Sequence, residues 1–326
     1  MPAIQYREAL NQALREEMRA NPDIFLMGEE VGAYDGAFKV TQGLLKEFGG
    51  KRVVDSPISE LGFVGLGIGA AMVGLRPCIE VMTWNFAILA MDQIVNNAAK
   101  LRYMSGGQLH CPIVFRGPTG AGTQLSSQHS QMLEAQYAYF PGLKVVTPGT
   151  PRDAKGLLKA ALREQDPVVF MESELLYSVK GEVEDGELVI PIGQAEVKRQ
   201  GAHATVVCWH RMIYPVLEAA EQLAKQGIEV EVVDMRTVRP LDMDTVLQSV
   251  RKTNRCVVVE EAWQIASVGA TIVDHVQREA FDELDAPVVR LNSKDVPMPY
   301  NKRLESMYAP GAEDVVAAVK KVLYVD

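Results

Sequence analysis

Cysteine is scarce in this sequence, and the few cysteines are scattered. The 326 residues include four, Cys78, Cys111, Cys208 and Cys256. None belongs to a Cys-x-x-Cys pair, and none has a histidine at ligand spacing. The pattern therefore predicts neither a disulfide framework nor a zinc site, and we expect buried thiols.

Long hydrophobic runs and basic clusters are also missing. The longest apolar run, residues 61–75, has 15 residues and includes five glycines, so it is too short and too weak to cross a bilayer. The net charge of −9 without a Lys/Arg cluster disfavours nucleic acid or an anionic membrane as main partner, whereas a basic protein partner is compatible. Residues 1–23 lack the apolar core of a secretory signal, so we expect a cytoplasmic chain.

Motifs for nucleotide binding and hydrolysis are not found. Gly65, Gly67 and Gly69 have the wrong spacing for G-x-G-x-x-G and lie inside the apolar run, away from any strand end. The segment GLLKEFGGKR does not match a phosphate loop, and no G-x-S-x-G elbow or metal-ligand cluster occurs. We expect the glycines mainly to allow close packing of a helix.

Apolar strands that alternate with helical patterns dominate what is present. Segments such as IFLMG, RPCIEVM and PVVFMES are separated by helical spacings, including one long helix expected over residues 87–104. This order predicts a mainly parallel sheet covered on both faces. A charged segment over residues 178–201 interrupts the pattern before a second series begins, so we predict two α/β domains, residues 1–190 and 191–326.

Glu60 is the lone carboxylate in the segment DSPISELGFVGLGIGAAMVG. Two interpretations are open. A first-turn acid is favoured by the helix dipole, by about 0.3–1 kcal/mol. Alternatively, burial raises the pKa of this acid until it exchanges a proton near neutrality. Composition does not decide between them.

Three further positions are candidates for a site. Glu29 and Glu30 follow an expected strand, where ligands of open α/β sheets bind, although adjacent acids usually face water. His129 lies in the polar loop SSQHSQ, where solvent exposure is the commoner outcome. Phe86, in TWNF, suits stacking on a flat ring, and core packing explains it equally well.

Several longer segments carry a resemblance to a known family. They are MGEEVGAYDGAFKVTQGL, TWNFAILAMDQIVNNAAKLRYMSGG, SSQHSQ, PGLKVVTPGTPRDAKGLL and VVDMRTVRPLD. Together they closely resemble the beta subunits of the thiamine-dependent pyruvate dehydrogenase decarboxylating component, over almost the whole chain. The resemblance implies a transketolase-like pyrimidine-binding domain followed by a transketolase C-terminal domain. In that family a separate alpha subunit carries the Gly-Asp-Gly magnesium motif, which this chain lacks.

The resemblance also implies roles for individual residues. Glu60 would hydrogen-bond the aminopyrimidine ring of thiamine diphosphate and so promote proton removal from the thiazolium carbon. Phe86 would stack on the pyrimidine, and Ile58 would contact the cofactor. His129 would lie near the substrate and lipoyl entrance, and Glu29 in an acidic tunnel between paired active sites.

The implied reaction is decarboxylation of pyruvate and acetylation of a lipoyl group, leading to acetyl-CoA. Family members often hold a potassium ion at positions that correspond here to Ile113, Ala161, Leu162, Glu164 and Asp166. At the last two positions, Glu164 and Asp166 replace the pair of residues that is commoner in the family.

The implied partners are an alpha subunit, in an alpha2-beta2 heterotetramer, and a dihydrolipoyl acyltransferase core. We expect Asp295 and the carboxylate of Asp326 to take part in core binding. Three alternatives stay open: a branched-chain 2-oxo acid or acetoin dehydrogenase beta subunit, a non-catalytic scaffold or regulatory subunit, and a thiamine enzyme that needs no second subunit.

Overall fold

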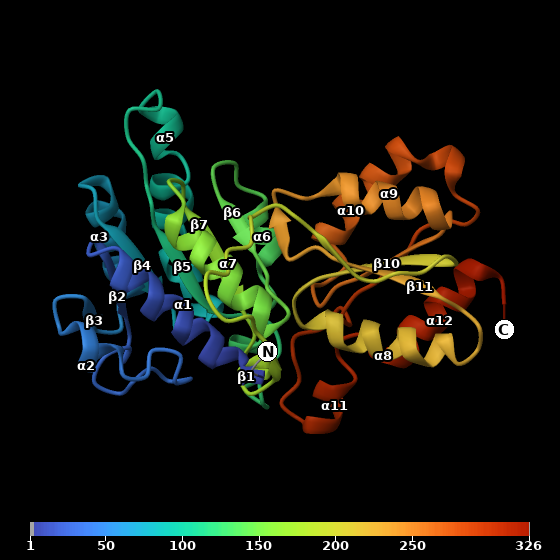
Figure 1. Cartoon of the computed structure of the whole chain (residues 1–326), viewed down its shortest axis with the longest axis horizontal. Coiled ribbons are helices and arrows are strands. Elements are labelled where there is room, and N and C mark those ends of the chain that lie inside the picture. The colour runs from blue at the N-terminus through green and yellow to red at the C-terminus, as the bar shows by residue number, and fades with distance from the viewer. Residues whose placement is uncertain (1–2, 326) are drawn as a thin grey trace.

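The chain folds into two α/β units that lie side by side (Figure 1). A computed structural model describes residues 3–325. The first unit runs from blue to green in the figure, and the second from yellow to red. The predicted boundary at residues 190/191 falls in the segment between β8 (Lys180–Glu182) and β9 (Glu196–Arg199).

A seven-stranded sheet forms the centre of the first unit, in the order β12-β6-β7-β5-β4-β2-β3. Every neighbouring pair is parallel except β12 with β6, so the predicted parallel sheet is confirmed for six strands. The antiparallel strand comes from the second half of the chain and was not expected. The strands are β2 (Ile24–Gly28), β3 (Val53–Asp55), β4 (Arg76–Glu80), β5 (Val114–Pro118), β6 (Lys144–Val146), β7 (Val168–Glu172) and β12 (Thr237–Arg239). Strand β1 (Ala3–Gln5) pairs separately with β8.

Helices cover this sheet, and α1 packs along α7 on one face (Figure 1). The buried residues of α1 recur at helical spacing, as the sequence predicts. Helix α7 begins with Pro151 after Thr150, whose hydroxyl accepts a hydrogen bond from the Asp153 amide at 3.1 Å. The helices of this unit are α1 (Tyr6–Ala20), α2 (Leu44–Phe48), α3 (Glu60–Met72), α4 (Trp84–Ala87), α5 (Leu101–Met104), α6 (Glu134–Ala138) and α7 (Pro151–Arg163).

The expected single helix over residues 87–104 is wrong. Helix α4 is followed by a 3₁₀ turn (Ile88–Ala90), a π-helical segment (Gln93–Ala98) and α5. In the π-helical segment the Ala99 amide donates to the Ile94 carbonyl, five residues back, at 3.0 Å. The buried residues Ala87, Ala90, Ile94 and Ala98 still recur three or four positions apart, so apolar spacing predicts one continuous helix across this change in hydrogen bonding.

The second unit has a five-stranded sheet in the order β14-β13-β10-β11-β9, parallel except for β9. Helices α8 and α12 lie on one face, and α9 and α10 on the other (Figure 1). Besides β9, its strands are β10 (Ala204–Cys208), β11 (Val230–Asp234), β13 (Cys256–Val259) and β14 (Val289–Leu291). Its helices are α8 (Ile213–Ala224), α9 (Met243–Thr253), α10 (Val268–Glu279), α11 (Lys302–Ser306) and α12 (Ala312–Leu323).

Burial confirms the expectation for the cysteines. All four cysteines are free and buried. Within residues 3–325, no helix combines the length and the apolar character that a bilayer span requires.

Candidate functional site

The predicted site residues follow the carboxyl ends of neighbouring strands in the first sheet. Glu29 directly follows β2, Glu60 begins α3 after β3, and Phe86 lies in α4 after β4. Because β3, β2 and β4 are neighbours and parallel, these ends meet at one edge of the sheet. This is the edge where open α/β sheets bind ligands.

Glu29 and Glu60 form a buried acid pair at this edge. Their exposed fractions are 6% and 5%. Burial, and then the charges of Glu60 and Glu30, raises the pKa of Glu29. Among the described residues, Glu29 Oε1 has no hydrogen-bond partner, and none donates a hydrogen bond to the Glu60 carboxylate. The pair can therefore accept hydrogen bonds from a ligand that presents N–H groups.

Phe86 and His129 line a small cavity next to the acid pair's strands. Their rings are in a T-shaped arrangement, with centroids 5.0 Å apart. The cavity has a volume of about 250 Å³ and is lined by Ala37, Phe38, Met82, Thr83, Phe86, Pro118, Thr119, Gly120, Leu125, His129 and Glu174. Aromatic side chains on the wall of a mainly apolar cavity, here Phe38, Phe86 and His129, suit a flat ring.

A loop after β5 brings His129 to this cavity. Its base is closed because the Gly120 amide and the Thr119 hydroxyl both donate to the Gln131 carbonyl, each at 2.9 Å. The Gln131 amide in turn donates to Asn85 Oδ1 at 3.1 Å, one residue before Phe86. The loop base and α4 are thus joined, which sets the two rings relative to each other.

Not every predicted residue lies on this cavity. Glu29 and Glu60 are not among its lining residues, and Ile58 is 84% exposed on the chain alone. The structure therefore brings the predicted residues together as two pairs, Glu29 with Glu60 and Phe86 with His129, on adjacent strands of one edge.

The residues implied for a potassium ion lie near the end of α7. Arg76 Nε donates to the Leu162 carbonyl at 3.1 Å, and Arg76 Nη2 donates to the carbonyl of Glu164. The Glu164 carboxylate pairs with Lys144 at 2.5 Å, and that of Asp166 with Arg102 at 2.7 Å. Both carboxylates have a cationic partner, and Arg76 occupies the Leu162 and Glu164 carbonyls, so a potassium ion here would have to share or replace these partners.

No group of three or more His, Cys, Asp or Glu side chains is placed to hold a metal ion anywhere in residues 3–325. The potassium ion implied at Ile113, Ala161, Leu162, Glu164 and Asp166 stays a prediction.

A buried ion-pair cluster below the site was missed by the sequence analysis. Arg116, in β5, pairs with Glu172 of β7 through two hydrogen bonds of 2.5 and 2.6 Å, and with Glu80 of β4. Tyr177 adds a hydroxyl donor to Glu172 at 2.8 Å. The two carboxylates raise the pKa of Arg116 well above its usual value, against the effect of burial. The available signal was a charged residue within or at the carboxyl end of each of three mainly apolar strands.

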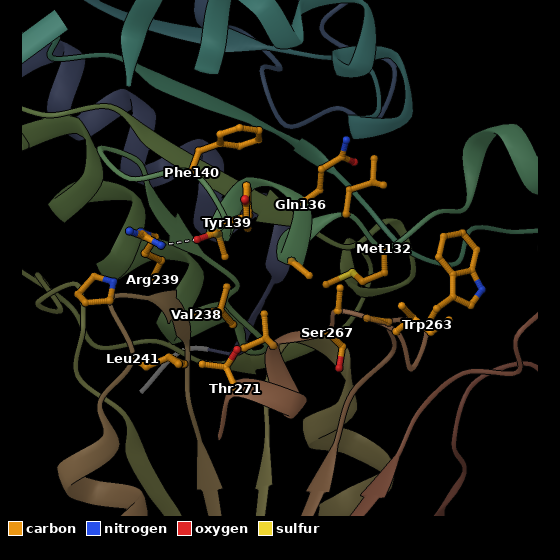
Figure 2. Close-up of a pocket in the computed structure, with 18 of the residues that line it drawn as sticks. Met132, Gln136, Tyr139, Phe140, Val238, Arg239, Leu241, Trp263, Ser267 and Thr271 are labelled. Atoms are coloured by element: carbon orange, nitrogen blue, oxygen red, sulfur yellow. Dashed lines mark hydrogen bonds between the residues drawn. The ribbon is translucent and has the colours of Figure 1, made fainter. Parts of the chain in front are cut away.

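A larger cavity, of about 970 Å³, lies between the two units (Figure 2). Tyr139 and Phe140 lie on one side of it, Arg239 and Leu241 on another, and the second unit contributes Trp263, Ser267 and Thr271. None of the predicted site residues lines it. Size alone would therefore have pointed away from the residues that the sequence predicts for the site.

Comparison with protein families matches both halves of the chain. Residues 2–180 match the family "Transketolase, pyrimidine binding domain", and residues 193–315 match "Transketolase, C-terminal domain". Among solved structures, a chain described as "Split gene transketolase, inactive beta4 tetramer" is similar with a TM-score of 0.81 and 26% identity, covering 99% of each chain.

Curated relatives extend over nearly the full chain. The pyruvate dehydrogenase E1 component subunit beta of Rickettsia bellii is 52% identical and covers 99% of both chains. The corresponding subunit of Rhizobium meliloti is 54% identical over 99% of this chain and 71% of the relative. The mitochondrial subunit of Bos taurus is 50% identical over 98% of this chain and 90% of the relative.

Proposed function

Because the chain belongs to the family of pyruvate dehydrogenase E1 beta subunits, we propose that its buried acid pair and aromatic cavity hold the aminopyrimidine end of thiamine diphosphate. The chain is a beta subunit of a thiamine diphosphate-dependent pyruvate dehydrogenase and acts with an alpha subunit. The observation that supports the site assignment is the buried Glu29–Glu60 pair. It lies beside Phe86 and His129, and it lacks hydrogen-bond donors.

Each residue has a distinct part in this proposal. The cofactor, when bound, supplies a carbon nucleophile and an electron sink for decarboxylation. Glu60 holds a proton against a ring nitrogen and so sets the tautomer of the aminopyrimidine. Phe86 gives the ring a flat surface, and Ile58, exposed beside α3, covers it once a second subunit is present. His129 orients the 2-oxo acid or the lipoyl group at the entrance.

Glu29 controls the charge of the pair. Its pKa is raised by burial and by its carboxylate neighbours, so Glu29 keeps its proton to a higher pH than a glutamate in water does. A proton kept by Glu29 is available to a hydrogen-bonded relay. The tunnel that links two active sites would begin at this residue.

The chain supplies half of a site, and the other half belongs to the alpha subunit. Helix α3 exposes Leu61, Leu66 and Met72 on its outer face, and nothing lies within 4 Å of the Cβ position of Gly69. Such an apolar face with small residues suits close packing against another subunit. We assign the diphosphate and magnesium to the alpha subunit of an alpha2-beta2 heterotetramer.

Several finer assignments remain predictions. Asp295, which is exposed, would bind a basic module of the acyltransferase core, whereas Asp326 lies outside the described residues. The domain boundary at 190/191, the potassium ion and a cytoplasmic location also rest on the sequence.

Replacement of Glu60 by glutamine tests the proposal. In a complex reconstituted with an alpha subunit, E60Q should lower kcat for pyruvate decarboxylation by about 10²–10⁴-fold, the usual contribution of a positioned acid. The matched control is E30Q, which removes an exposed carboxylate beside the pair and should change kcat less than about twofold. A wild-type rate for E60Q would mean that this acid is structural and that the chain fits a scaffold.

Two titrations separate the remaining alternatives. Thiamine diphosphate should bind tightly only when both subunits are present, and tight binding by this chain alone would support a single-subunit enzyme. Rates with pyruvate and 3-methyl-2-oxobutanoate should favour pyruvate, the substrate named in the relatives.

A further inference from the structure

We propose that Glu261, a residue of the second unit, is a positioning residue for the loop of residues 118–131 that brings His129 to the cavity. The loop belongs to the first unit, and Glu261 lies 140 residues further along the chain than Ala121. The inference rests on the proposed function only for its kinetic effect, because the contact itself is a property of the fold.

Glu261 binds the loop backbone directly. Its side chain is buried between the two units, and the Ala121 amide donates to its Oε1 at 2.6 Å. Gly120, with a φ of +79°, approaches so closely that a Cβ there would lie 2.8 Å from both carboxylate oxygens. The loop therefore takes a left-handed turn against this carboxylate, which a residue with a side chain could not follow.

Arg211 keeps the carboxylate charged. Burial opposes ionisation, but Arg211 Nε donates to Glu261 Oε2 at 2.6 Å, and His210 Nδ1 lies 3.8 Å from the same oxygen. These neighbours lower the pKa of Glu261 to about 2. The bond to Ala121 is therefore charge-assisted, which makes it stronger than a bond between neutral groups.

Successive hydrogen bonds connect the contact between Glu261 and Ala121 to the cavity. Gly120 closes the loop base on Gln131, and Gln131 is bound by Asn85, the neighbour of Phe86. A second contact from the same unit supports the loop further out, where Glu305 Oε1 accepts from the Gln124 amide at 3.0 Å. The second unit thus holds the loop on which the geometry of His129 depends.

The test compares E261Q with E260Q in the reconstituted complex. Glutamine has the shape of glutamate, but its amide places an N–H against either Ala121 or Arg211, so one contact is lost. Glu260 is the matched control because it is an equally buried carboxylate that binds Ser267, Gly269 and Asn292 within the second unit. Both variants remove one buried charge at adjacent positions.

E261Q should increase amide exchange in residues 119–131 and lower kcat about 10- to 100-fold, as for a displaced catalytic group. KM for thiamine diphosphate should change less than about threefold, because Glu60 is not on the loop. E260Q should leave exchange in the loop and kcat near the wild-type values. The shorter side chain of E261D cannot reach both partners of the Glu261 carboxylate. Its kcat should therefore recover less than half of the rate that E261Q loses.

Unchanged exchange in E261Q, or a kcat within twofold of wild type, overturns the proposal, as does an equal loss of kcat in E260Q. If E261Q does not assemble, R211Q tests the same contact from its partly exposed side and carries the same expectations. A wild-type complex that does not decarboxylate pyruvate would contradict the proposed function instead, and the exchange comparison would still decide the role of Glu261.

Discussion

Replacement of Arg116 by methionine should destabilise the first unit strongly. The side chains of Arg116, Glu80 and Glu172 are only 1%, 8% and 0% exposed. Methionine fills much of the same space but leaves two carboxylates buried without their cation. Breaking a buried ion pair costs about 3–5 kcal/mol, and Tyr177 still donates to Glu172, so we expect a loss within that range. In a unit of about 190 residues this lowers Tm by about 6 °C or more.

The loss should depend on pH. Burial raises the pKa of Glu80 in the wild type, and Arg116 opposes this effect. Without Arg116, the pKa of Glu80 in the folded chain rises further above the pKa of Glu80 in the unfolded chain. The destabilisation is therefore small near pH 4.5 and grows as the pH rises through the folded-state pKa.

Urea unfolding of the chain at pH 5 and pH 8, followed by circular dichroism, measures both effects. The triple variant E80Q/R116M/E172Q removes all three charges and should recover much of the loss, because neutral groups cost less to bury. A loss below about 1 kcal/mol at both pH values, or a triple variant as unstable as R116M, would refute the reasoning.

Three further predictions concern single residues. The pKa of Glu29 is raised from 4.5, so the wild type should lose free energy of unfolding relative to E29Q as the pH rises from about 4.5 through that raised pKa. A difference in free energy of unfolding by urea that stays constant across this pH range would contradict the prediction. Burial, with Glu260 adding to it, raises the pKa of Glu134 to about 8, so E134Q should gain stability over wild type progressively between pH 4.5 and 8 and stay level above, as chemical unfolding can measure. Gly142 has a φ of +99°, and its Cβ position lies 1.9 Å from the Ala99 carbonyl oxygen, so G142A should lower the free energy of unfolding by more than about 3 kcal/mol. The control G49A, with a φ of +76° and open space around the Cβ position, should lower it by about 1–2 kcal/mol. Equal losses of free energy in the two variants would show that backbone strain alone matters.

Local features of the chain could be predicted well because their causes lie within a few residues. Helices α9 (Met243–Thr253) and α12 (Ala312–Leu323) bury apolar residues that recur at helical spacing along the sequence. In α9 the Asp242 side chain accepts from the Thr245 amide at 3.1 Å, a cap that is visible in the sequence. The π-helical segment before α5 was missed because the buried residues around it still recur three or four positions apart, as they do in an α-helix.

The candidate site was predicted in part. Motifs and family resemblance selected Glu29, Glu60, Phe86 and His129, and the alternation of strands and helices placed Glu29 at a strand end. Spacing could not tell which of these side chains meet, because the order of strands in a sheet is set by packing over long separations. The short edge strand β12 was missed for the same reason.

By itself, then, the sequence determined the two α/β units, the carboxyl edge and the residue types that the chemistry needs, since these follow from periodicity and motif. Only the tertiary structure decided that Glu29 faces Glu60, that Arg116 joins three strands, and that Glu261 holds the loop of His129. These contacts join residues 31 to 140 positions apart. Arg116 and Glu261 form theirs because burial leaves a charge or an amide that a distant partner must satisfy, whereas Glu29 and Glu60 meet because the strands before them are neighbours in the sheet.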